Sequence, residues 1–251
     1  LGTFYIIFKV YKTEFKEYLY LQCFKPKFKI LLDLLSQGIP AALGMMMISV
    51  GVFIILFFIS QYGDLALAGY GTAIRYEQIF LLPVLGLNTA VLSMVGQNFG
   101  AKNIERVEEI YNKALYFGCT FMFVCGFVIY FTASTAVGLF TDDPEVIKYG
   151  TMYLQITALM EPIYPIFFIS NALIQGIKKA NVVMMLTFGR MVFMPAIVLT
   201  YLIFYLESSF AFVFWGLLII NWIFGIFVFM LTKRLISKEK KRMINKLIKE
   251  Y

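Results

Sequence analysis

The chain has 251 residues, of which 61% are hydrophobic and 15% are charged, and its mean hydropathy is +0.80. A soluble domain has about 45–50% apolar and about 25% charged residues, so this composition excludes an ordinary water-soluble fold and indicates a protein of the lipid bilayer. The net charge of +7 then concerns orientation and lipid headgroups rather than nucleic acid. The absence of histidine excludes histidine metal sites and proton relays.

The first 33 residues contain no complete membrane span. Residues 1–8 are apolar, but a transmembrane helix needs roughly 20 apolar residues. We therefore expect the end of a preceding transmembrane helix here, and a longer protein whose N-terminal part is missing. Residues 9–33 follow as a basic cytoplasmic connector, for which an ordinary surface helix is the alternative. This connector carries Lys9, Lys12, Lys16, Lys25, Lys27 and Lys29.

Six apolar segments long enough to cross a membrane follow, at residues 34–60, 66–99, 114–140, 146–175, 182–206 and a sixth that ends near Thr232. The loops at 61–64, 142–145 and 207–209 contain no lysine or arginine, whereas the other connections are basic. The positive-inside rule then places both ends of the chain in the cytoplasm. The fold class predicted is an all-α polytopic membrane protein with a six-helix lobe at 34–232.

Residues 233–251 form a strongly basic tail with an apolar stripe at Met243, Ile244, Leu247, Ile248 and Tyr251. A helix with this pattern is expected to lie on the inner leaflet of the membrane. A solvated tail with no special role is an equally good interpretation.

Between the second and third spans the sequence becomes polar at Gly96, Gln97, Asn98, Gly100 and Asn103. We expect Gly100 to adopt the left-handed conformation that ends a helix. We expect Asn103 to cap the start of the next helix. This stretch therefore reads as a short turn between two long helices at a water interface.

The pattern Gly-Gln-Asn-x-Gly-Ala-x-Asn after a membrane helix resembles a signature of the multidrug and toxic compound extrusion (MATE) family of efflux antiporters. Further similar pieces are Gly38-Ile39-Pro40, the acidic loop at 140–147, and Arg190 five residues before Pro195. The resemblance covers nearly the whole chain. It implies one lobe, helices seven to twelve, of a transporter with two six-helix lobes. Residues 176–181 depart from the family pattern, which weakens assignment to a subfamily.

Apart from Lys148 near the start of its span, four charged residues fall within the predicted spans, where a charge costs about 2.5–3.5 kcal/mol at the centre of a helix. Arg75 and Glu77 are expected near the outer interface, where water can reach them. Glu161 and Arg190 are expected deeper, at depths that differ by about 7 Å at ~1.5 Å per residue. We hypothesise that Glu161 and Arg190 pair beside an inner cavity. A static ion pair between two helices is the alternative.

Pro162 and Pro165 directly follow Glu161 and are expected to bend its helix. A bent helix beside a buried carboxylate suits a gate or a cation site, and a bend that serves packing alone is the other interpretation. The candidate ion-coupling or gating residues are thus Glu161, Arg190, Pro162 and Pro165.

A substrate cavity is predicted from side chains that suit varied apolar cations. Tyr164, Asn171 and Gln175 fall near one face of their helix, and neighbouring methionines give a soft wall. Plain helix packing explains the same residues. The predicted cavity residues are Met45, Met46, Asn88, Tyr164, Asn171 and Gln175.

The function implied by the resemblance is secondary antiport, in which cationic or amphipathic drugs and metabolites leave in exchange for Na⁺ or H⁺. Expected partners are the small-molecule substrate, the lipid bilayer of the plasma (inner) membrane and the missing N-terminal lobe of the same protein. Nucleic acid, a bound metal and a cofactor other than the coupling ion are not expected. The sequence shows no nucleophile motif, so an enzyme is not expected. Two alternatives stay open: a lipid-linked oligosaccharide flippase or polysaccharide exporter of the same superfamily, and a non-transporting scaffold or degenerate half-transporter.

Overall fold

The structure, a computed structural model, describes residues 8–9, 12 and 27–250, with side chains described to residue 245. The chain divides into two compact units, residues 1–39 and 40–251. The predicted end of a preceding helix and most of the predicted connector lie outside the described residues. The connector's predicted end at residue 33 falls inside a helix, because α2 already begins at Phe28.

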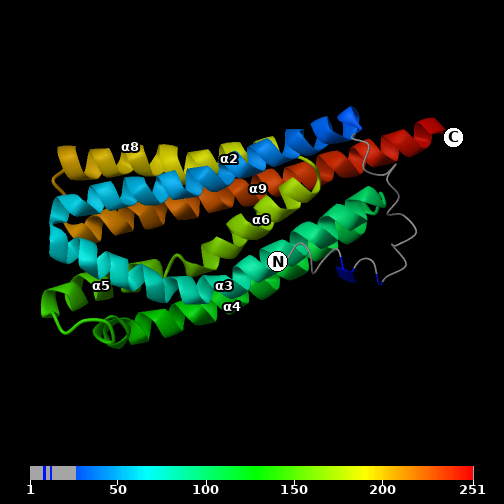
Figure 1. Ribbon diagram of the computed structural model, residues 1–251. Coiled ribbons are helices and arrows are strands. Elements are labelled where there is room, and N and C mark those ends of the chain that lie inside the picture. The colour runs from blue at the N-terminus through cyan, green and yellow to red at the C-terminus, as the bar shows by residue number, and fades with distance from the viewer. Residues whose placement is uncertain (1–7, 10–11, 13–26, 251) are drawn as a thin grey trace. The chain divides into compact units, whose positions relative to one another are not determined.

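Every regular element in the described part of the chain is helical (Figure 1). Five helices are long and apolar enough to cross a membrane, and a sixth crossing results when the pair α5–α6, bent by 46°, counts as one span. This agrees with the predicted count of six. The elements are α2 (Phe28–Ile59), η3 (Ser60–Tyr62), α3 (Asp64–Gly100), α4 (Ile104–Gly138), α5 (Pro144–Thr157), η4 (Glu161–Ile163), α6 (Tyr164–Gly176), α7 (Ala180–Phe188), η5 (Gly189–Phe193), α8 (Met194–Thr200), η6 (Tyr201–Tyr205) and α9 (Phe210–Glu250).

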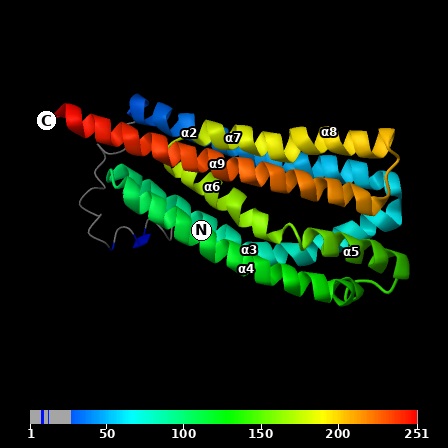
Figure 2. The same cartoon turned by 180° about the vertical axis from the view of Figure 1, so that it is seen from behind.

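Within the unit 40–251 the helices lie in two groups (Figures 1 and 2). One group contains α3, α4 and the α5–α6 pair, and the other contains α7, α8, α9 and the last part of α2. Helix α6 joins the groups because it packs on α3, α4 and α9. The break between α5 and α6 therefore contacts helices of both groups.

Helices α3 and α5 approach closely through two glycines. A Cβ atom on Gly69 would lie 2.8 Å from the Val146 carbonyl oxygen, and one on Gly150 would lie 3.0 Å from the Gly69 oxygen. Contacts this short exclude a larger side chain without movement of the backbone. This approach allows side chains of α5 to reach the inward face of α3.

The turn between α3 and α4 corrects one prediction. Gly100 is still helical, and the left-handed residue is Lys102, with φ of 60°. The Asn103 N–H donates to the Asn98 oxygen at 2.9 Å and the Lys102 N–H to the Phe99 oxygen at 3.1 Å, so these two bonds close the helix two residues later than predicted. Asn103 caps α4 as predicted, since its side chain accepts from the Arg106 N–H.

Hydrogen bonds also fix the opposite ends of the helices, both within one connection and between two connections. Asp143 caps α5 by accepting from the Glu145 N–H at 2.9 Å, and Pro144 occupies the first turn, a position that suits proline because its missing N–H needs no partner there. The Tyr62 hydroxyl donates to the Ser208 carbonyl at 2.6 Å. This bond ties the α2–α3 connection to the α8–α9 connection at one end of the lobe.

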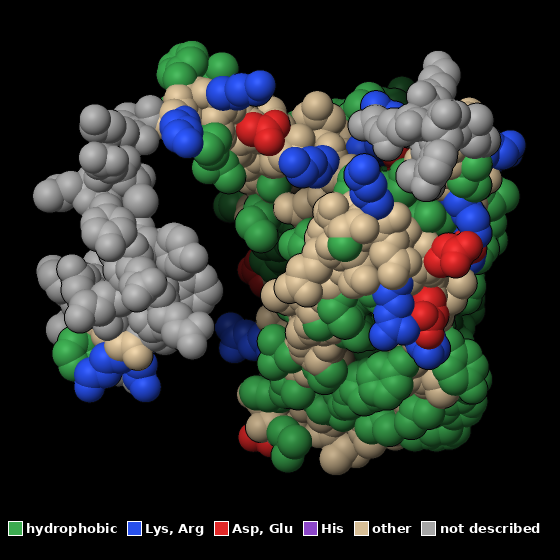
Figure 3. All heavy atoms as spheres, turned by 90° about the vertical axis from the view of Figure 1, so that its right-hand side faces the viewer, with side chains coloured by type: hydrophobic (Ala, Val, Ile, Leu, Met, Phe, Trp, Pro, Cys, Tyr) green, Lys and Arg blue, Asp and Glu red, His purple; other side chains and the backbone are tan. Residues whose placement is uncertain are grey.

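The basic tail is continuous with α9, which runs to Glu250. Three ion pairs join this part of α9 to the rest of the lobe. Their nitrogen–oxygen distances are 2.7 Å for Lys179–Glu239, 3.4 Å for Lys240–Glu105 and 3.7 Å for Lys233–Glu108. Figure 3 looks onto this end and shows basic and acidic side chains close together. The tail is thus an ion-paired extension of the lobe, and its contact with a lipid leaflet remains a prediction.

Candidate functional site

Glu77 is the first component of the candidate site. It lies on the inward face of α3, where it is 3% exposed. Its carboxylate accepts hydrogen bonds from the Tyr153 hydroxyl of α5 and, at 3.0 Å, from the Tyr164 hydroxyl of α6. Three helices therefore converge on one carboxyl group.

The expectation that water reaches Glu77 near the outer interface is wrong. Glu77 follows Asp64, the first residue of α3, by 13 residues. At ~1.5 Å per residue this is about 20 Å along the axis, and protein groups leave the residue only 3% exposed. Arg75, two residues away, is exposed, because residues i and i+2 of a helix do not share a face.

Glu161 is the second component, and it lies in the break between α5 and α6. The residue is fully buried, and neither of its carboxylate oxygens has a hydrogen-bond partner in the described part of the chain. The break interrupts regular backbone bonding, and the Trp222 indole of α9 donates to the free Leu159 carbonyl at 3.1 Å. The bend predicted at Pro162 and Pro165 is confirmed, with Pro162 in η4 and Pro165 in the first turn of α6.

The two buried carboxyl groups share one interior, because Tyr164, whose hydroxyl binds Glu77, follows Glu161 by three residues. Two carboxylates in one low-dielectric interior repel each other unless a cation or a proton lies between them. Among the described residues no group of three or more His, Cys, Asp or Glu forms a set that would hold a metal ion.

Arg190 is the third component and lies in η5, a π-helical turn. Its guanidinium carbon is 3.7 Å from the centre of the Phe167 ring and 5.3 Å from that of the Tyr164 ring. Its Nε donates to the Asn221 Oδ1 of α9 at 3.0 Å. Such turns are frequent at functional sites of membrane and soluble proteins, and this one directs a charge into the lobe.

The predicted pair between Glu161 and Arg190 is wrong, because both Glu161 oxygens are unpartnered and Arg190 is bonded to Asn221. The carboxyl group that interacts electrostatically with Arg190 is Glu77. The prediction counted residues along two unbroken helices. The break beside Glu161 and the π-helical turn at Arg190 change the direction of both side chains.

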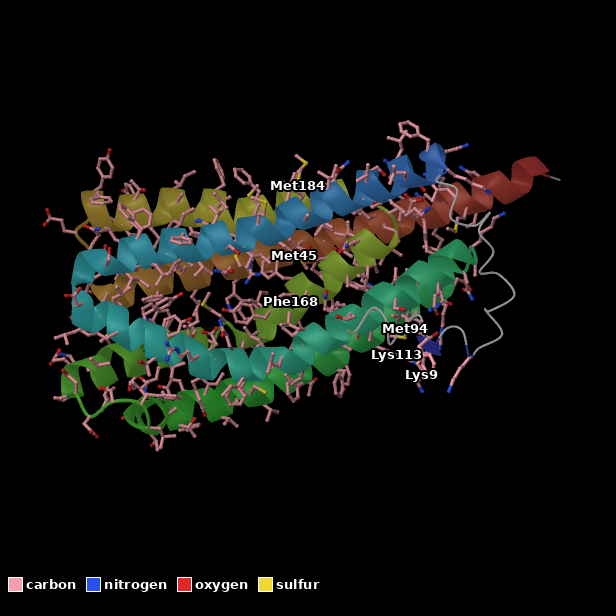
Figure 4. The ribbon with its side chains drawn as sticks, viewed as in Figure 1. Lys9, Met45, Met94, Lys113, Phe168 and Met184 are labelled. Atoms are coloured by element: carbon pink, nitrogen blue, oxygen red, sulfur yellow. The ribbon has the colours of Figure 1, made fainter. Side chains whose placement is uncertain are left out.

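The predicted substrate cavity is only partly related to this site. Of the six predicted cavity residues, Tyr164 belongs to the site because it binds Glu77. None of the described hydrogen bonds or ring contacts joins the other five predicted residues to Glu77, Glu161 or Arg190. Met45 and Met46 are 75% and 60% exposed on α2, which touches α7 at Gly44 and Met184. Figure 4 labels Met45 and Met184, together with Phe168 of α6. Asn88 and Gln175 are half-buried, and Asn171 buries an unpartnered side-chain oxygen.

Gly126 of α4 allows the broken segment to pack against that helix. A Cβ atom there would lie 2.5 Å from the Ala158 carbonyl oxygen and 3.5 Å from the Glu161 Cβ. We expect Gly126→Val to lower the stability of the folded protein by about 1–3 kcal/mol, the usual cost of overpacking, and to impair function by displacing Glu161. Thermal unfolding in detergent measures the stability. Gly138→Val on the same helix is the matched control, because a Cβ atom there would meet only the Ile147 Cδ1 atom, at an ordinary 3.9 Å. Equal losses in both variants would contradict this role of Gly126.

The fold and the site define a multi-pass helical membrane protein in which a broken span carries buried charge, an arrangement found in secondary transporters. The chain belongs to the MatE family, whose model matches residues 40–202. The family and fold predicted from the sequence are thus confirmed.

Curated relatives have names that concern drug resistance. The chain is 31% identical over 151 residues to "Probable multidrug resistance protein YpnP" of Bacillus subtilis (strain 168), covering 60% of this chain and 34% of that protein. It is 26% identical over 175 residues to "Multidrug export protein MepA" of Staphylococcus haemolyticus (strain JCSC1435), covering 70% and 38%. The chain therefore spans little more than a third of the length of these relatives.

Solved structures share the fold. A multidrug resistance MATE family transporter in an outward-facing conformation matches with a TM-score of 0.85 at 24% identity, over 93% of this chain and 53% of that one. A MOP superfamily transporter from Pyrococcus furiosus matches with the same TM-score of 0.85 at 24% identity, over 93% and 54%. The chain thus corresponds to about half of each solved transporter.

Proposed function

We propose that the protein exports small amphipathic or cationic molecules across the plasma (inner) membrane by antiport against Na⁺ or H⁺. The observation that carries the proposal is the fully buried carboxyl group of Glu161, at a break in a membrane span, whose two oxygens have no hydrogen-bond partner among the residues that the structure describes. A buried, unpaired ionisable group within a span is costly and marks ion or proton pathways in membrane proteins. The names of the relatives in Bacillus and Staphylococcus supply the substrate class.

The coupling ion is proposed to bind between Glu161 and Glu77. Binding of a proton or Na⁺ relieves the repulsion between the two carboxylates, and its release restores that repulsion. The tyrosine hydroxyls on Glu77 hold α5 and α6 against α3, so the charge state of the site acts on both halves of the broken span. Alternating access would then follow from movement of this lobe against a second lobe.

The proposed orientation places both ends of the chain in the cytoplasm. The turn at Lys178 and Lys179 and the ion-paired end of α9 are basic, whereas the α4–α5 connection contains Asp142 and Asp143. An excess of lysine and arginine on the cytoplasmic side is the general rule for membrane proteins.

The test is transport of ethidium by the whole protein in vesicles, with the Na⁺ and proton gradients collapsed separately. We expect collapse of the coupling gradient to lower the initial rate at least about tenfold, which corresponds to ~1.4 kcal/mol of activation free energy. Collapse of the other gradient should leave the rate unchanged. Export that persists after both gradients are removed would contradict antiport.

A further inference from the structure

Helix α9 has an exposed surface whose composition changes along its length. Between Phe210 and Met230 every exposed residue is large and apolar. These eight residues are Phe212, Trp215, Ile219, Ile223, Ile226, Phe227, Phe229 and Met230. Phe212 and Met230 are 18 residues apart, or about 27 Å along the axis, which is close to the ~30 Å thickness of the hydrocarbon layer. This part of α9 therefore has the length and the composition of a lipid-facing surface.

Beyond Met230 the exposed residues of α9 become basic and polar. Up to residue 245 they are Arg234, Ser237, Lys238, Lys241, Arg242, Ile244 and Asn245. None of them is acidic, because Glu239, the acidic residue of this part of α9, is buried at 4% exposure. Arg234 follows Met230 by four residues, about 6 Å along the axis. Positive charge thus begins where the hydrocarbon layer would end and the lipid headgroups begin.

The cations of this part of α9 are divided between two sides of the helix. Lys233 and Lys240 form ion pairs with α4, and Arg242 lies 3.8 Å from Glu239. The other three cations form no hydrogen bond or ion pair with any residue in the described part of the chain. We name these three residues the α9 basic face: Arg234, Lys238 and Lys241.

The α9 basic face continues the lipid-facing surface of the same helix. At 3.6 residues per turn its three residues lie within about 60° of the direction of Ile223, which is 64% exposed. Ile236 and Met243 lie on the opposite side, where they pack in the core of the lobe. Met243, part of the apolar stripe expected on the inner leaflet, thus contacts protein. The side of α9 that is left for the leaflet is its basic face.

The chemistry of this surface fits a phospholipid with an anionic headgroup. Acyl chains can pack on the apolar part of α9, while the phosphate oxygens accept hydrogen bonds from the ammonium and guanidinium groups just beyond it. An anionic leaflet attracts lysine and arginine side chains within a Debye length of its surface. A free phosphate ion or a nucleic acid would use the charges but leave the adjoining apolar surface uncovered.

We infer that the α9 basic face binds the headgroup of an anionic phospholipid whose acyl chains lie against the apolar part of the same helix. The inference does not depend on the proposed export function, because it is built on α9 alone. The bound lipid holds one side of a helix whose other side is ion-paired to α4.

A fluorescent label at residue 237 tests which lipid lies beside this face. Ser237 is exposed and lies between Arg234 and Lys238. Bimane is attached at Ser237→Cys in the whole protein, with its other cysteines replaced by serine, in vesicles. The quenchers are phosphatidylglycerol and phosphatidylcholine with a nitroxide near the headgroup end of one acyl chain. We expect half-maximal quenching at a mole fraction of phosphatidylglycerol about fivefold below that of phosphatidylcholine, and a preference below about twofold in ~1 M salt.

Replacing all three residues of the α9 basic face with glutamine should reduce the preference for phosphatidylglycerol to below about twofold. The variant Lys238→Arg/Lys241→Arg keeps the charges and should keep the preference. The matched control, Lys102→Gln/Arg106→Gln/Lys113→Gln, removes three exposed cations outside α9 and should also keep it.

Three results would overturn the inference. The first is equal quenching by the two lipids in the unmodified protein, and the second is a preference that survives in the triple glutamine variant of the α9 basic face. The third is quenching by neither lipid, which would show that another part of the protein covers this face.

Discussion

Replacing Glu161 with glutamine is expected to lower ion-driven export by about a hundredfold or more, equivalent to ~2.7 kcal/mol of lost transition-state stabilisation. Glutamine has nearly the same shape but cannot take up a proton or carry the negative charge that attracts Na⁺. Neither oxygen of Glu161 has a hydrogen-bond partner, so the substitution breaks no bond within the described part of the fold. Burial of a neutral amide is also less costly than burial of an unpaired carboxylate.

The same reasoning predicts that Glu161→Gln leaves the thermal unfolding temperature unchanged or raises it. Export should therefore fall while stability does not, which a residue needed only for packing would not show. Rates of ethidium export in energised vesicles and unfolding in detergent measure the two quantities. Glu108→Gln is the control, because Glu108 is a half-exposed glutamate that lies 3.7 Å from Lys233. A Glu161→Gln variant with normal export and normal ion dependence would show that Glu161 has no coupling role.

The spans and their order could be predicted because the bilayer imposes simple constraints. Apolar segments of sufficient length must become helices, since lipid offers no partners for backbone groups. The cap at Asn103 was equally accessible, because it depends only on the residue directly before the helix, whose side chain accepts from the N–H three residues further on. The bend beside Pro162 follows from the missing backbone donor of proline.

The composition of the site could not be predicted, because it depends on which face of a helix turns inward. Arg75 and Glu77 have nearly the same depth and opposite environments, and only the packing of α5 and α6 on α3 distinguishes them. The contact of Tyr153 with Glu77 joins residues 76 positions apart. No local pattern marks such a contact, nor the π-helical turn that directs Arg190 towards Asn221.

Replacing Arg190 with methionine is expected to tighten binding of the coupling ion and to slow turnover. Arg190 interacts electrostatically with Glu77 but binds no carboxylate oxygen directly, so it repels an incoming cation or proton without neutralising the site. Removal of its charge should lower the half-saturating concentration of the coupling ion about tenfold, or ~1.4 kcal/mol. The maximal rate should fall by a similar factor, because the ion must leave the site once in every cycle.

The initial rate of ethidium export at a series of coupling-ion concentrations separates the two effects. Arg190→Lys is the matched variant, since it keeps the positive charge but loses the planar contact with Phe167 and the geometry of the bond to Asn221. Its half-saturating ion concentration should stay within about threefold of that of the unmodified protein, because the electrostatic interaction with Glu77 persists. If the half-saturating ion concentration of the methionine variant equals that of the unmodified protein, Arg190 serves only to hold α9 to the π-helical turn. A shift in the methionine variant alone would mean that its charge sets how readily the carboxyl pair releases the ion, since both variants disturb the same packing.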